Sequence, residues 1–317
     1  MKKKLILIII CFLALVVFCA LRDFVIKQVI TLAASNITGA PTRIGGFSLS
    51  IIRQSVKITN FKMYSPKDFP PDVMVDIPLL GVSYDILPLI RGKIHLKELT
   101  LDLKEMGLIK NEEGKLNVDS LKLSEPKDKP DKPAKPVKQM SIQMDLVNLN
   151  IGRVVSKDYS VSGPTAIKVY DIGIKKTYKN INSAQQLAAL IIAEPLKAAG
   201  IQGLGIYGAS VLTGVAALPV AAVFTFAGKD YARSEYNVSW EKAYEVSLSI
   251  LKTSGAVKKE DKTMGIINAE VGNSKVTLKL KKVTDKKTEI TVSARKYMLP
   301  QPEVAAGIIY SISGKLK

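Results

Sequence analysis

Hydrophobic and polar residues alternate along the first half of this chain, but the alternation slips by one position at four places. Val56 and Ile58 stand two apart, as side chains on one face of a strand do, and Phe61 and Met63 follow one position out of phase after Asn60. A β-bulge absorbs one extra residue and keeps both pairs on one face. The same order of apolar pair, polar residue and apolar pair recurs in residues 94–101, 144–151 and 167–174. The pattern therefore predicts four bent strands, each with one apolar face.

That apolar face needs a cover, because each exposed Leu or Ile side chain forgoes about 1.5–3 kcal/mol of burial. Residues 40–180 contain no amphipathic helix pattern. A second sheet, the helix after the first apolar run, residues 183–228 or lipid acyl chains are the alternatives. A closed sandwich would be a binding or scaffold module, whereas an open groove filled by lipid would be a carrier. The groove would be lined by Val56, Ile58, Phe61, Met63, Ile94, Leu96, Leu99, Leu101, Met144, Leu146, Leu149, Ile151, Ile167, Val169, Ile172 and Ile174.

The chain opens with MKKK and a run of seventeen apolar residues that ends before Arg22. This length suits a short membrane span or the hydrophobic region of a signal peptide. Phe18 is too bulky for a small-residue cleavage site, so we expect an uncleaved transmembrane anchor. The leading lysines place its N-terminus in the cytoplasm and export the remainder. A helical pattern continues the anchor to residue 39, where Gly39 and then Pro41 end it.

Three further regions follow the anchor region, residues 1–39. Residues 40–180 are predicted to form a β domain, which contains a Pro- and Lys-rich tether at 125–138. Residues 181–228 have helical spacing and become Gly- and Ala-rich, and no charge occurs from Ala198 to Gly228. This hydrophobic helical segment is a candidate second membrane span, a helix hairpin in the bilayer or a helix packed on protein.

Residues 229–317 are predicted to form a small separate domain. Trp240, Tyr244 and Leu251 lie on one helical stripe, three alternating strands follow, and a short apolar helix ends the chain. The order α-β-β-β-α indicates an antiparallel sheet with both helices on one face. The whole chain is therefore expected to be α+β: a transmembrane helix, a curved antiparallel β-groove or sandwich, hydrophobic helices and this domain.

The composition offers little support for catalysis. The cysteines, Cys11 and Cys19, both lie in the first apolar run, and His95 is the only histidine. No nucleophile has a partner base, and no acidic cluster has the spacing of metal ligands. GLGIYG at 203–208 matches a dinucleotide-binding pattern but follows a helical segment instead of a strand. We expect no enzyme activity, no cofactor and no metal site.

The net charge of +18 is compatible with nucleic acid, with anionic lipid or with simple solubility. Lysines cluster in a predicted hairpin near the C-terminus, without the arginines and aromatic platforms of nucleic-acid binders. Export also argues against nucleic acid. An anionic phospholipid headgroup is the expected partner, and a solvated lysine face is the alternative. The cluster comprises Lys279, Lys281, Lys282, Lys286 and Lys287.

The N-terminal 180 residues resemble the AsmA family of Gram-negative envelope proteins. The resemblance rests on the anchor, on ITGAPTRIGGFSLSI, on LPLIRGKIHLKELTLDL and on EEGKLNVDSL, with the matching positions Leu87, Pro88, Leu89, Gly92, Ile94, Gly114 and Asn117. It implies an inner-membrane anchor, a periplasmic β domain similar to bridge-like lipid transfer proteins with a hydrophobic groove, and a role in outer-membrane assembly and lipid homeostasis. The β region is too short to cross a periplasm alone.

The C-terminal domain resembles a small uncharacterised domain of bacterial lipoproteins, which implies no activity. The matching positions are Tyr231, Glu235, Tyr236, Ser239, Trp240, Ala243 and Tyr244.

These observations lead to two functional hypotheses. The first is a lipid-handling protein of the inner membrane, with one or two spans and a periplasmic β domain. It would bind acyl chains in the groove and contribute to phospholipid transport or outer-membrane assembly. The second is a non-enzymatic assembly factor that binds envelope proteins at its sheet edges.

Overall fold

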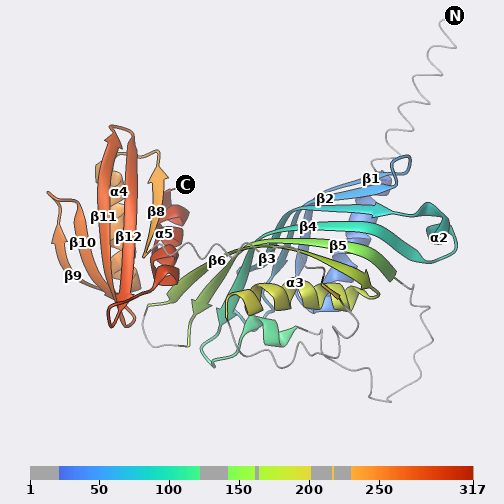
Figure 1. The fold of residues 1–317 in the computed structure, drawn as a ribbon, viewed down its shortest axis with the longest axis horizontal. Coiled ribbons are helices and arrows are strands. Elements are labelled where there is room, and N and C mark those ends of the chain that lie inside the picture. The colour runs from blue at the N-terminus through green and yellow to red at the C-terminus, as the bar shows by residue number, and fades with distance from the viewer. Residues whose placement is uncertain (1–20, 122–141, 161–163, 201–215, 218–229, 317) are drawn as a thin grey trace, which may run out of the picture.

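The computed structural model describes residues 21–121, 142–160, 164–200, 216–217 and 230–316. The fold is α+β, with two largely antiparallel sheets and a few helices (Figure 1). Within these ranges no helix has both the length and the apolar character needed to cross a bilayer. The predicted span within residues 5–21 lies, apart from Leu21, outside the described residues. The tether at 125–138 and most of the charge-free segment lie outside them too.

The first sheet has seven strands in sequential order. They are β1 (Thr42–Ser50), β2 (Ser55–Tyr64), β3 (Val73–Tyr84), β4 (Ile94–Lys110), β5 (Ile142–Asp158), β6 (Ala166–Ile181) and β7 (Ala216–Ala217). Neighbours are antiparallel except β4 and β5, which are parallel. Residues 111–141 therefore join the end of β4 to the opposite end of the sheet. This connection contains the predicted tether and begins with a turn and a short 3-10 helix, Asn117–Ser120.

A single crease crosses this sheet from β1 to β6. The pairing between neighbouring strands is interrupted at Gly45, Asn60, Pro78, Lys104 and Gly152. On β6 it shifts by one residue beside Gly173. Asn60 has φ 52° and Gly173 has φ 50°, a backbone region that Gly and Asn enter at low cost. Because adjacent strands break their pairing at the same level, the sheet bends as a unit.

The crease explains the slipped alternation. On β2 the residues that face the core are Val56 and Ile58 before Asn60, and Phe61 and Met63 after it. The register with β1 and β3 is the same on both sides of Asn60, so the change of phase is shared by the three strands and needs no extra residue. The predicted bulge at this motif is therefore a crease shared between strands. On β4 a true one-residue bulge lies at Lys97, beside the predicted Glu98.

The other two motifs differ from the prediction. On β5 the strand pairing shows no shift at Asn148. Met144 and Val147 both lie in the core, so the alternation changes phase between these two residues, before Asn148. Leu146 is therefore left out of the core. On β6 the shift lies at Gly173, two residues after Asp171. The alternation within one strand does not show where the pairing with its neighbours is interrupted. For this reason the sequence predicts the wrong position of the phase change on β5 and β6.

Two helices cover the apolar face of the sheet. Residues 21–38 form a helix that ends at Gly39, as the pattern predicts. Helix α3 (Ala184–Ala198) begins at Ser183, whose hydroxyl caps it by accepting from the backbone N–H of Gln186, and lies beneath the arched sheet (Figure 1). A short helix, α2 (Ile86–Ile90), joins β3 to β4. The helical pattern predicted through residue 228 is wrong at β7, which pairs with β6.

The C-terminal domain is built from β8 (Tyr231–Tyr236), α4 (Trp240–Ser254), β9 (Ala256–Asp261), β10 (Ile266–Val271), β11 (Ser274–Thr284), β12 (Lys287–Lys296), β13 (Leu299–Pro300) and α5 (Pro302–Leu316). The predicted helices and three central strands are present, and α4 and α5 share one core with the sheet. The prediction missed β8, β9 and β13. Strand β9 reads as a charged, exposed segment, so its sequence lacks an alternating apolar signal.

Candidate functional site

The structure brings most of the predicted groove residues onto one face of the first sheet, but other side chains of the protein cover much of that face. A continuous core is formed with Leu190, Ile192 and Leu196 of α3. The predicted residues buried in it are Met63, Leu99, Leu101, Met144, Leu149, Ile151, Ile172 and Ile174, and Phe61 and Leu96 pack against it. Ile58 is also buried, opposite Phe47 and Leu80. Helix α3 therefore occupies the middle of the predicted groove.

The position of α3 is fixed by polar contacts as well as by packing. The Lys176 ammonium on β6 contacts the Glu194 carboxylate on α3 at 2.5 Å, and both side chains are largely buried. Burial raises the pKa of the neighbouring Tyr178 hydroxyl, and the Glu194 carboxylate raises it further. Tyr178 therefore stays neutral beneath the helix. This part of the groove is closed by an ordered protein element.

An apolar cavity remains at the other end of the same face, between the helix of residues 21–38 and strands β1 to β4. Its volume is about 300 Å³. It includes the predicted groove residues Val56, Ile94 and Leu96, and Leu89 of α2 both lines it and is 43% exposed. The cavity therefore reaches the protein surface at α2. We call it the end pocket; the remaining lining residues are Ile26, Ile30, Phe47, Leu49, Val82, Tyr84, Asp85 and His95.

The polar side of the end pocket is a paired cluster. His95 Nε2 lies 2.8 Å from Asp145 Oδ2, and its Nδ1 lies 3.8 Å from Asp85 Oδ2. His95 is half-buried between these two carboxylates. In the described part of the chain no three His, Cys, Asp or Glu side chains are placed to hold a metal ion. The lining of the end pocket is therefore apolar except near Tyr84, Asp85 and His95.

Three predicted groove residues lie away from the core face. Leu146 is half-buried opposite Glu98 and Lys179. Ile167 and Val169 lie beneath the C-terminal domain, where α5 packs on β6 with Gly307 against the backbone of Ile167. Tertiary packing thus divides the β6 motif between the two faces of the sheet.

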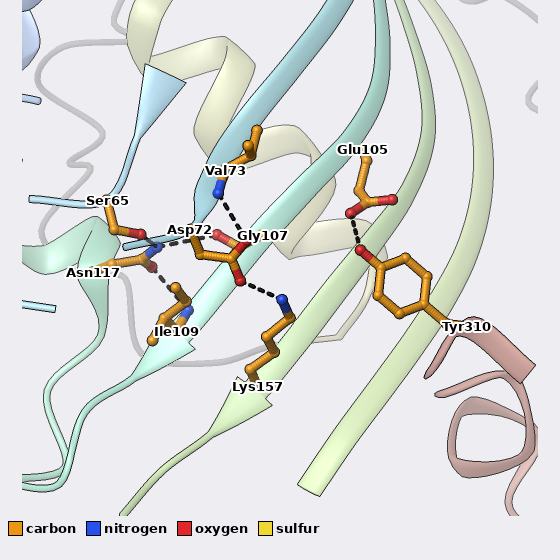
Figure 2. Close-up of polar contacts among 9 residues, drawn as sticks. All are labelled: Ser65, Asp72, Val73, Glu105, Gly107, Ile109, Asn117, Lys157 and Tyr310. Carbon is orange, nitrogen blue, oxygen red and sulfur yellow. Dashed lines mark hydrogen bonds and ion pairs between the residues drawn. The ribbon is translucent and has the colours of Figure 1, made fainter. Parts of the chain in front are cut away.

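A polar cleft of about 800 Å³ lies between the first sheet and the C-terminal domain. Tyr310 of α5 donates a hydrogen bond to Glu105 of β4 at 2.7 Å (Figure 2), and Arg153 of β5 donates to the same carboxylate at 2.9 Å. Burial and the Glu105 carboxylate raise the pKa of Tyr310. Lys157 also pairs with Asp72 here. The Tyr310–Glu105 hydrogen bond joins the two domains, so we assign it to domain docking, whereas the Arg153–Glu105 and Lys157–Asp72 pairs lie within the first domain.

Sequence reasoning missed several residues of the core face and of the end pocket. Val147 on β5 stands at a spacer position of its motif, and Val154 on β5 and Met106 on β4 lie beyond the motifs, yet all three are fully buried. Continuing the alternation across the crease would have identified Val154 and Met106, because the phase changes there once more, and extending the pair Leu149 and Ile151 backwards by two residues would have identified Val147. Phe47 and Leu49 belong to a Gly- and Ser-rich stretch and carry a weak strand signal.

Comparisons with protein-family models and with curated proteins give no match for this chain. The resemblance to AsmA proteins consequently rests on the sequence motifs alone.

Proposed function

We propose that this chain is a membrane-anchored envelope protein of AsmA type that holds a lipid acyl chain in the end pocket and contributes to phospholipid transport or outer-membrane assembly. The observation that carries the proposal is an apolar cavity open at the end of the sheet where the predicted anchor enters. Its volume is at the small end of ligand pockets, which span roughly 300–1,000 Å³. It suits part of one acyl chain, each buried methylene of which contributes about 0.8 kcal/mol.

The proposal narrows the hypothesis drawn from the sequence. Residues along the whole strands were expected to line an open groove, but α3 buries the central ones. The lipid site we propose is therefore confined to Val56, Ile94, Leu96 and their neighbours around the end pocket. The protein would take up or present a single chain at the inner membrane, with the β domain in the periplasm, and a complete bridge is not part of the proposal.

Photocrosslinking in intact membranes tests this site. A photoreactive side chain at Val56 or Leu96 is expected to capture phospholipid, because both line the end pocket. Lys57 and Lys97 are the matched controls, since each is adjacent in sequence and exposed. Equal or greater capture from the lysines would overturn the proposal.

A pocket-filling substitution provides an independent measurement. Leu96→Trp is expected to reduce the lipid that co-purifies with the detergent-extracted protein in native mass spectrometry, because the indole occupies the end pocket. Leu79→Trp, on the same sheet at a partly exposed position, is expected to leave it unchanged. Unchanged lipid in a folded Leu96→Trp protein would count against acyl binding at this site.

The alternative function, a non-enzymatic assembly factor that binds envelope proteins, is favoured by a different observation. The turn from β12 to β13 exposes Tyr297, Met298 and Leu299, with exposed fractions of 88%, 86% and 67%. Exposed apolar residues of this kind are common at protein interfaces. Capture of one defined protein from this turn, with no lipid in the end pocket, would favour the alternative.

A further inference from the structure

The end of the first sheet nearest residue 21 carries an unusual number of exposed apolar side chains. They come from the turn between β1 and β2 and from α2, and Ile52 and Ile90 are 95% and 77% exposed. Both segments lie at the same end of the sheet (Figure 1). We call this surface the apolar tip and define it as Ile51, Ile52, Leu87, Leu89 and Ile90.

The two segments of the apolar tip are joined by hydrogen bonds. The backbone carbonyl of Gln54 accepts from the N–H of Tyr84 at 2.9 Å, and its side-chain oxygen accepts from the N–H of Ile86 at 3.2 Å. The Tyr84 hydroxyl donates to the Ser50 carbonyl at 3.3 Å. The tip is therefore one surface with a defined shape.

The helix of residues 21–38 starts at the same end. Arg22 donates to the carbonyl of Leu49 at 3.0 Å, and Lys27 donates to that of Gly45 at 2.9 Å, so the helix runs along β1. Its outer side exposes a stripe of Leu21, Phe24, Val25, Val29 and Leu32. The stripe and the apolar tip together hold ten of the seventeen large apolar residues that are exposed in the described part of the chain.

Positive charge surrounds this surface. Arg53 follows the turn isoleucines, and Arg91 and Lys93 follow α2; all three are exposed and make no ion pair with any residue that the structure describes. The nearby carboxylates are already engaged, because Asp23 pairs with Arg22, and Asp85 faces His95 and Lys97. Exposed apolar groups edged by basic side chains match an anionic lipid surface, in which acyl chains lie below phosphate groups.

We propose that the apolar tip and the helix stripe dock on the anionic lipid surface of the membrane, with Arg53, Arg91 and Lys93 at the level of the phosphates. The apolar run that precedes residue 22 leads into this end of the domain, so anchor and tip would meet the same leaflet. The inference shares the anchor with the proposed function, but it does not depend on whether the end pocket holds a lipid.

Fluorescence of the full chain in nanodiscs tests the docking. An environment-sensitive dye on Ile52→Cys or Ile90→Cys, in a Cys11→Ser/Cys19→Ser background, is expected to shift to the blue and to be quenched by lipids with a spin label in the acyl chain. The same dye on Met264→Cys, an exposed apolar position in the C-terminal domain, is expected to remain in water. Dyes at Ile52 and Ile90 that behave like the dye at Met264 would overturn the proposal.

Charge removal tests the headgroup contact. Arg53→Gln/Arg91→Gln/Lys93→Gln is expected to lose the additional quenching that phosphatidylglycerol gives over phosphatidylcholine. The substitution Lys258→Gln/Lys259→Gln, at exposed lysines of β9, is the matched control and is expected to retain it. Equal quenching in both lipids for the unaltered protein would refute the anionic preference. Because lipid in the end pocket is measured separately, failure of docking and failure of acyl binding give different results.

Discussion

At the scale of single residues, Asn117 shows how a motif residue can serve structure. Its side chain is fully buried, donates to the Ser65 hydroxyl and to the Gly107 carbonyl, each at 3.1 Å, and accepts from the N–H of Ile109 at 3.1 Å (Figure 2). It thereby ties the chain after β4 to the end of β4 and to the chain after β2. These three hydrogen bonds give Asn117 a structural role in this fold.

Asn117→Leu is expected to lower the free energy of unfolding by about 2–4 kcal/mol, because three buried polar groups lose their partner. The measurement is denaturant unfolding of the detergent-solubilised protein, followed by circular dichroism. Asn148→Leu is the control: Asn148 is more exposed and bonds to Glu98 at the surface, so a change below about 1 kcal/mol is expected. Equal effects of the two substitutions would contradict a special role for Asn117.

At the scale of elements, the crease decides how the strands present their apolar residues. Gly152 lies on the crease, where an added Cβ would approach the carbonyl oxygen of Lys104 on β4 to 2.6 Å. Backbone cannot yield as a flexible side chain does, so close packing of β4 and β5 requires glycine here. A six-strand bend that depends on such positions is a property of the sheet and not of any one strand.

Gly152→Ala is expected to destabilise the first sheet by about 1–3 kcal/mol through overpacking. Gly81→Ala on β3, where an added Cβ meets nothing within 4 Å, is expected to be neutral or to stabilise by up to about 1 kcal/mol. Thermal unfolding of both variants against the unaltered chain separates them. A stable Gly152→Ala protein would show that the crease tolerates a side chain.

At the scale of the whole molecule, α5 connects the two sheets. Its residue Gly307 lies so close to β6 that a Cβ would overlap the carbonyl of Ile167, whereas a Cβ on Gly314, about two turns further along the same helix, would meet nothing within 4 Å. Tyr310 lies between them in sequence and bonds to Glu105. Gly307 and Tyr310 therefore place α5 directly against the first sheet.

Gly307→Ala is expected to displace α5 from β6 and to increase amide hydrogen exchange in residues 166–171, since those strand residues lose their cover. Gly314→Ala is expected to leave that exchange unchanged and to stabilise α5 by up to about 1 kcal/mol, the usual gain of alanine over glycine in a helix. Mass spectrometry of peptides from both variants provides the comparison. Unchanged exchange in both would show that the domains are held together elsewhere.

The sequence by itself determined the α+β class, the strands around all four motifs, α3 and the core helices and strands of the C-terminal domain. Periodicity is local, and a segment that buries one face records that face in its own residues. The helix of residues 21–38 was predicted for the same reason.

Only the tertiary structure decided which residues share a surface. Leu146, Ile167 and Val169 have the same apolar character as Ile172 and Ile174, but strand register and the docking of α5 place them on the other side of the sheet. The end pocket likewise depends on a helix and four strands meeting at one end. Burial by a distant segment leaves no trace in local alternation, because an apolar side chain is equally well buried by α3, by α5 or by lipid.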